Sequence, residues 1–285
     1  MPFNQALILA LLQGATELFP VSSLGHAVLL PSLLHWSYQQ SDRAFLPFLT
    51  LLHLGTATAL LILFWRTWWR VAVAFFRLAI RGRIETPDER LAMLLIVGTI
   101  PTGAIGVAFK DRLTQLFAAP RAAAVLLLVN AAILFGAELL RRRRERELQL
   151  EDREKQEAAF ADMPRLPYRA ALLIGLCQSL ALLPGISRSG ATLAGGLLAG
   201  LRHQEAARFS FLLATPIIAA AGLVEVPVLF SAGVPLGEYL LAAVAAGVAA
   251  YISARFLVRY FRTGRLDPYA AYCAALGVVS LVLLR

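Results

Sequence analysis

Six stretches of about 17 to 22 residues in this chain are almost wholly apolar, and each is long enough to cross a bilayer as a helix. The lipid interior offers no water to backbone groups, so a spanning segment must satisfy its own hydrogen bonds. Only 16% of the residues are charged, against roughly 25% in a soluble domain. The sequence therefore predicts an all-α integral membrane protein with spans at 44–64, 91–109, 122–140, 209–230, 236–254 and 268–284.

Basic residues gather in three segments between these spans, expected as loops, at 66–83, 141–169 and 255–265. The positive-inside rule assigns such segments to the cytoplasm. These basic segments beside the spans account for the net charge of +9, so we expect no nucleic-acid partner. Cys177 and Cys273 lie in apolar runs and suggest neither a disulfide framework nor a zinc site.

Two further apolar stretches, about 3–34 and 170–201, are interrupted by polar turns. The run before Gln13 is too short to span, and we expect Gly14, Pro20 and Gly25 to break the helix there. Each stretch therefore predicts a re-entrant hairpin of two half-helices. The three basic segments fall on one face of the membrane if each hairpin enters and leaves by the same side.

The two halves of the chain resemble each other at an offset of 165 residues. This offset pairs Gln13 with Gln178, Leu18 with Leu183, Ser22 with Ser187 and Gly25 with Gly190. A hairpin and three spans make each half, and because three is odd the second copy must be inverted. We predict a first membrane repeat at 1–140, a charged cytoplasmic linker at 141–169 and an inverted second repeat at 170–285. Chance similarity between two turns of small residues is the alternative.

The first polar turn places several reactive groups close together. Gln13 and Glu17 are four residues apart and share a helical face. Ser23 and His26 lie within one turn of each other, whereas Ser22 is expected to cap the second half-helix. Ionisable groups at membrane depth are functional candidates by default. The competing interpretation of Glu17 is a carboxylate that caps a helix or extends to the interface.

The second polar turn predicts an anion-binding site. Arg188 lies between Ser187 and Ser189 and is followed by Gly190. Backbone N–H groups at such a turn, beside a helix N-terminus, favour a phosphate. A structural ion pair between Arg188 and Glu17 across the two halves is the rival interpretation, and the two are compatible.

These motifs are similar to those of a known family. Gln-x3-Glu followed by Phe-Pro-Val-Ser-Ser-x-Gly-His, together with Pro-Gly-Ile-Ser-Arg-Ser-Gly-Ala-Thr, resembles the undecaprenyl-diphosphate phosphatase family of the bacitracin-resistance type. The resemblance covers nearly the whole chain. It implies an enzyme of the bacterial inner membrane that hydrolyses a polyprenyl diphosphate to the monophosphate and phosphate. This reaction recycles the lipid carrier of cell-wall synthesis and confers bacitracin resistance.

The resemblance also implies roles for individual residues. Ser23 would be the nucleophile and His26 would relay its proton, although His26 as the nucleophile itself stays open. Arg188, with Ser187, Ser189 and Gly190, would bind the substrate phosphates. Glu17, and more weakly Gln13, would hold a divalent cation, Mg²⁺ or Ca²⁺. The site would open to the periplasmic side among membrane lipids, and a homodimer is left open.

Three positions depart from the family pattern. Gln13 occupies a place where the family has Glu or Gln, and His53 stands where Gln is common. Tyr272 is followed by Cys273, where a Tyr-Arg pair is frequent. A transporter or flippase for a lipid-linked or anionic substrate is the alternative function, since an inverted repeat suits alternating access.

Overall fold

The computed structural model describes residues 1–36, 44–116, 119–147, 163–231, 234–262 and 264–284. Within these ranges all regular structure is helical, as predicted. The helices are α1 (Phe3–Thr16), α2 (Ser23–Leu33), α3 (Phe45–Leu63), α4 (Trp65–Arg81), α5 (Pro87–Ala108), α6 (Lys110–Leu116), α7 (Pro120–Glu147), α9 (Tyr168–Ser179), α10 (Arg188–Leu198), α11 (His203–Ser231), α12 (Leu236–Tyr260) and α13 (Asp267–Leu283), with 3-10 turns at Met163–Arg165 and Leu180–Leu182.

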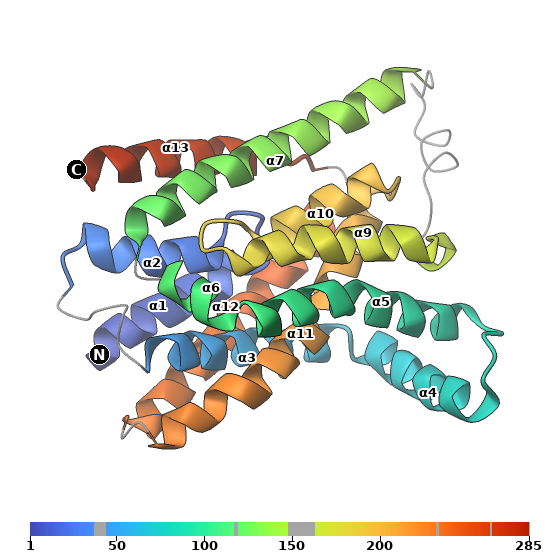
Figure 1. Ribbon diagram of the computed structural model, residues 1–285, viewed down its shortest axis with the longest axis horizontal. Helices are drawn as coiled ribbons and strands as arrows, with labels where there is room; N and C mark the ends of the chain where they lie inside the picture. The colour runs from blue at the N-terminus through green and yellow to red at the C-terminus, as the bar shows by residue number, and fades with distance from the viewer. Residues whose placement is uncertain (37–43, 117–118, 148–162, 232–233, 263, 285) are drawn as a thin grey trace.

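Five of the described helices are long and apolar enough to cross a membrane, namely α3, α5, α7, α11 and α12. They coincide with five of the six predicted spans. The sixth predicted span, 268–284, is the 17-residue apolar helix α13, which lies against α7 (Figure 1). The chain is therefore a multi-pass membrane protein.

Both predicted hairpins are present as pairs of short helices, α1 with α2 and α9 with α10. The expectation that Gly14 and Gly25 break the first hairpin is wrong, because both lie inside helices. The break falls between residues 17 and 22, where Ser22 has a φ of 64°. Gly14 instead permits close packing, since a Cβ there would lie 2.1 Å from the carbonyl oxygen of Ala246.

Each hairpin packs against a span from the other half of the chain. Helix α1 contacts α12, and α9 contacts α5. The second contact is equally close, because a Cβ on Gly175 would lie 2.3 Å from the carbonyl oxygen of Gly98. Small residues let helix backbones approach where lipid provides no hydrophobic driving force. The two halves are therefore interlocked, and this brings the two polar turns together.

Two segments differ from the sequence prediction. The first basic segment, expected as a loop, forms α4, whose buried face carries Thr67, Val71 and Ala74. Trp69 and Phe76 are exposed on this helix. The predicted linker 141–169 begins as helix, because α7 continues to Glu147. The part of the linker at 148–162 lies outside the described residues.

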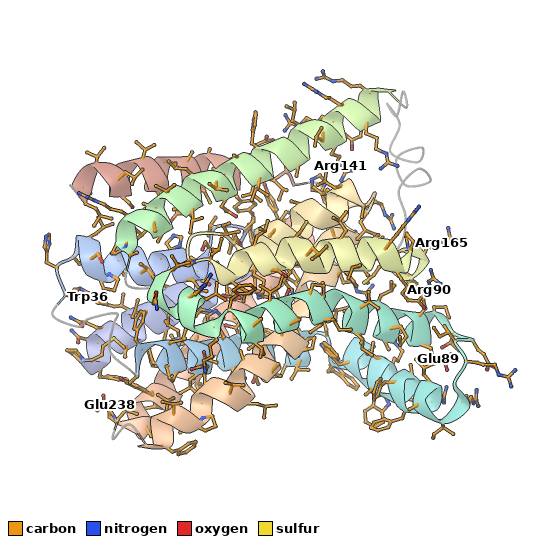
Figure 2. All side chains as sticks on the ribbon, in the orientation of Figure 1. Trp36, Glu89, Arg90, Arg141, Arg165 and Glu238 are labelled. Atoms are coloured by element: carbon orange, nitrogen blue, oxygen red, sulfur yellow. The ribbon has the colours of Figure 1, made fainter. Side chains whose placement is uncertain are left out.

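The described ends of the chain lie at the same end of the molecule, at the left of Figure 1. Trp36 and Glu238 lie near that end, whereas Glu89, Arg90 and Arg165 lie near the opposite end (Figure 2). Of these residues only Arg165 belongs to a predicted basic segment, and it lies at the end away from the described ends of the chain. The inverted relation of the halves, and their orientation in a membrane, remain predictions.

Candidate active site

A cavity lies where the two hairpin turns meet α3, α5 and α11. Its polar end is lined by Glu17, Ser22, Ser23, His53, Ser187 and Arg188. The remaining wall is largely apolar and includes Leu46, Leu49, Val107, Ile217 and Ile218. The cavity therefore joins a charged, partly desolvated centre to a surface suited to a hydrocarbon chain.

The two hairpins present matching helix N-termini to this cavity. The Ser22 hydroxyl accepts a hydrogen bond from the backbone N–H of Gly25 at 3.1 Å and so caps α2. The Ser187 hydroxyl accepts from the N–H of Gly190 at 3.1 Å and caps α10. The capping role predicted for Ser22 is confirmed. Since helix N-termini carry partial positive charge, both favour an anion here.

Asn130, from the middle of α7, ties the two turns together. Its Nδ2 donates to the carbonyl oxygen of Pro20 at 3.1 Å, and its Oδ1 accepts from the N–H of Ser187 at 3.0 Å. Cys273 Sγ lies 3.3 Å from the same Nδ2 and is fully buried. Asn130 was not among the site residues predicted from sequence, although a polar side chain inside an apolar span was the available signal.

Several groups of the second turn that were predicted to bind an anion already form hydrogen bonds within the protein. The N–H groups of Ser187 and Gly190 are already satisfied by Asn130 and by the Ser187 hydroxyl. The Ser189 hydroxyl donates to the carbonyl oxygen of Phe19 at 2.9 Å. The second turn therefore contributes chiefly its arginine side chain and its helix N-terminus to the cavity.

Glu17 is the centre of the polar network. It follows α1 directly, and only 4% of its surface is exposed. Its Oε1 accepts from Arg188 Nη2 at 2.5 Å and from Nε at 3.2 Å. Its Oε2 accepts from Gln13 Nε2 at 2.9 Å and from the Ser23 hydroxyl. The ion pair between Arg188 and Glu17, one of the two interpretations left open, is present.

His53 adds a second basic partner, which the sequence marked only as a departure from the family pattern. Its Nε2 lies 3.1 Å from Glu17 Oε2, and its Nδ1 lies 2.7 Å from the carbonyl oxygen of Leu49. A carbonyl only accepts, so Nδ1 carries a proton. The contact with Glu17 therefore needs a further proton, held by either the imidazole or the carboxyl group.

His26 has different partners from those expected. Its Nδ1 donates to the carbonyl oxygen of Ser22 at 2.7 Å, and its Nε2 lies 2.7 Å from the hydroxyl of Tyr272, which donates to it when the imidazole is neutral. Among the described hydrogen bonds, Ser23 is joined to Glu17, and none joins it to His26. The structure thus brings Ser23, Glu17 and Arg188 into one network and places His26 beside it.

The two residues predicted to hold a divalent cation, Glu17 and Gln13, lie together in this network. Glu17 and Gln13 provide the hard oxygen atoms that Mg²⁺ and Ca²⁺ prefer. Gln13 Oε1 is buried and has no hydrogen-bond partner within the described chain. The described residues contain no group of three or more His, Cys, Asp or Glu side chains that could hold a metal ion. The remaining ligands of a cation would therefore come from phosphate and water.

The sequence matches the family model described as bacitracin resistance protein BacA over residues 6–279. A relative from Acidiphilium cryptum, named undecaprenyl-diphosphatase, is 48% identical over 98% of this chain and 97% of its own length. Relatives with the same name from Mycobacterium avium and Granulibacter bethesdensis are 48% and 46% identical, over 99% of this chain and 97% and 96% of theirs. The interlocked hairpins and their polar network are thus those of a member of the bacitracin resistance protein BacA family.

Proposed function

We propose that this chain is an undecaprenyl-diphosphatase of the bacterial inner membrane. It would release the terminal phosphate of the lipid diphosphate, recycle the carrier of cell-wall synthesis and confer bacitracin resistance. The observation that carries this proposal is Arg188, which lines the cavity beside Ser23 and has a buried Nη1 without a hydrogen-bond partner in the described structure. A phosphate oxygen is the natural acceptor for that group.

Charge supports a diphosphate ligand. Arg188 contributes one positive charge, and the proton shared by Glu17 and His53 compensates the carboxylate at the polar end of the cavity. The N-termini of α2 and α10 add partial positive charge. In a site shielded from water, such fixed groups stabilise the charge that develops on a phosphoryl group.

Ser23 is the nucleophile in this proposal. Its Oγ forms a bond to the terminal phosphorus while the bond from phosphorus to the bridging oxygen breaks, so the lipid monophosphate leaves. Water then hydrolyses the phosphoserine and releases inorganic phosphate. A hydroxyl needs a neighbouring base for this attack, and Ser23 already donates its hydrogen to Glu17.

Glu17 is therefore our choice of proton acceptor in place of His26. Arg188 pairs with Glu17 through Nε and Nη2, and an arriving phosphate would accept from Nη1 of the same guanidinium. Glu17 Oε2, which already accepts from the Ser23 hydroxyl, is then positioned to take its proton. His26, held by Ser22 and Tyr272, acts as a positioning residue that orients the turn carrying Ser23.

A divalent cation held by Glu17 and Gln13 would neutralise substrate charge when bound. The apolar wall, including Leu49 and Ile217, would take the prenyl chain while the head group stays at the polar end. We place the opening of the cavity on the periplasmic side, because the basic segments mark the other face as cytoplasmic.

The test is phosphate release from undecaprenyl diphosphate by the purified protein, with and without a chelator. We expect release by the wild type, its loss in excess chelator, and its loss in Ser23→Ala while substrate binding survives. Glu17→Gln should also be inactive. Ser32→Ala, on the same helix but outside the cavity lining, is the matched control and should retain activity.

Two results would contradict parts of this proposal. Near-normal release by Ser23→Ala together with an inactive His26→Ala would make His26 the nucleophile. Absence of release by the wild type, with transport of the lipid in vesicles, would instead favour the flippase.

A further inference from the structure

The cavity contains a second charged pair at a distance from the polar centre. Lys110, the first residue of α6, lies 2.6 Å from Glu225 of α11, measured from Nζ to Oε1. Both residues line the cavity. The proposed chemistry uses neither of them. A carboxylate inside an apolar helix is costly and needs a reason.

The pair bridges two walls of the cavity. Thr102 and Gly106, four residues apart on α5, line one wall, and Lys110 lines it as the first residue of α6, after α5 has ended at Ala108. On α11, Ala221 and Glu225 are also four residues apart and line the cavity. Residues four apart on one helix share a face. The ion pair therefore connects the wall formed by α5 and α6 to the wall formed by α11.

Exposure increases toward Lys110, which we take as the mouth of the cavity, whereas the Glu225 side chain is 14% exposed. The Glu17 side chain is 3% exposed and that of Arg188 is 14% exposed, whereas the Lys110 side chain is 47% exposed. Of the charged residues that line the cavity, Lys110 is thus the one most open to its surroundings. An anion entering from this end meets Lys110 before it meets Arg188.

We propose that Lys110 is an entry site for the phosphate of a lipid-linked substrate and that its ion pair with Glu225 closes the mouth until this phosphate arrives. The ammonium exchanges the Glu225 carboxylate for a phosphate oxygen, and the walls formed by α6 and α11 are released from each other. This inference rests on the proposed phosphatase function and adds an entry site to it.

Charge makes the exchange favourable. A phosphate group carries about −1.5 to −2 charges near neutral pH, against one for Glu225. The single amine of Lys110 suits transient contact, because a lysine binds phosphate as a point charge without the two-point geometry of arginine. A transient contact holds the head group only until Arg188 takes it. Lys110 should therefore affect capture of the substrate more than the chemical step.

The experiment compares steady-state kinetics of phosphate release for wild type, Lys110→Met, Lys110→Arg, Glu225→Gln and Lys110→Met/Glu225→Met. We expect Lys110→Met to raise KM roughly tenfold with kcat nearly unchanged, as when a steering charge is lost. Lys110→Arg keeps the positive charge, so its KM should not rise. Glu225→Gln should lower KM, because it removes the competing carboxylate.

The double variant separates entry from a structural role. An apolar pair often replaces an ion pair without loss of stability, so a purely structural bridge would be restored in Lys110→Met/Glu225→Met. Our proposal requires KM to stay high in that variant while its thermal unfolding temperature returns to that of the wild type. A normal KM in the double variant would overturn the entry role.

Two further measurements distinguish substrate entry from general surface charge and from product exit. Arg112→Met removes an exposed cation from α6 that does not line the cavity, and its KM should match the wild type. An equal rise in KM for Arg112→Met would show that Lys110 acts only through general surface charge, and it would overturn the proposal.

Inhibition by inorganic phosphate should be unchanged in Lys110→Met. A weaker inhibition with a normal KM would make this an exit site for product. Failure of the phosphatase function itself would appear separately, as a wild type that releases no phosphate.

Discussion

Arg188 serves two partners through different nitrogen atoms. Nε and Nη2 donate to one oxygen of Glu17, and Nη1, which has no partner within the described chain, is left for a phosphate. A lysine offers one nitrogen and cannot maintain this planar two-sided arrangement. We therefore expect Arg188→Lys to lower kcat by a factor of about 10² to 10³, the cost typical of losing one electrostatic donor in an active site.

The matched control for this change is Arg169→Lys, at an exposed position on α9. It makes the same chemical replacement away from the cavity and should leave kcat unchanged. Kinetics of Arg188→Lys that match the wild type would show that Arg188 only supports the structure.

At the scale of helices, the site depends on how closely α1 approaches α12. Glu17 follows the last turn of α1, and Gly14 lies against the backbone of Ala246. A methyl group at Gly14 would lie 2.1 Å from that carbonyl oxygen, so the helices must separate. We expect Gly14→Ala to lower unfolding stability by about 1 to 3 kcal/mol and to reduce activity by displacing Glu17. Thermal unfolding in detergent and phosphate release would measure the two effects.

Gly136 of α7 provides the opposite case. A Cβ at Gly136 meets no described atom within 4 Å, so Gly136→Ala should be neutral or stabilise the protein by up to about 1 kcal/mol through helix propensity. Equal behaviour of the two variants would contradict the role of close packing between α1 and α12.

At the scale of the whole molecule, the distribution of charged segments predicts one orientation. In a background where Cys177 and Cys273 are replaced by Ser, a cysteine at Glu238 should react with an impermeant reagent on intact cells. A cysteine at Arg83, in the connection between α4 and α5, should react only after the membrane is opened. Both positions are exposed. The reverse pattern of labelling would invert the proposed topology.

The parts of this architecture that sequence could predict are those set by local composition. The apolar spans and the two hairpins follow from the length of apolar runs and from the polar turns that interrupt them. Helix α4 was missed because its arginines were counted as loop charges, although Trp65, Trp69, Phe76 and Ile80 follow the spacing of an amphipathic helix.

The partners of the site residues were harder to predict, because they come from distant parts of the chain. The contacts of Glu17 with His53, of His26 with Tyr272 and of Asn130 with Ser187 join helices that only the fold brings together. The sequence placed Ser23 beside His26 by spacing alone. Spacing could not show that the Ser23 hydroxyl turns toward Glu17 instead.

The offset that relates the two hairpins has a consequence for the history of this protein. Ser23 and Arg188 are themselves 165 residues apart, so the predicted repeat pairs them with each other. Two identical copies would carry the same residue at both positions and could not supply both the proposed nucleophile and the arginine that binds the phosphate. If the halves are copies, the proposed reaction therefore requires that they have diverged at this position.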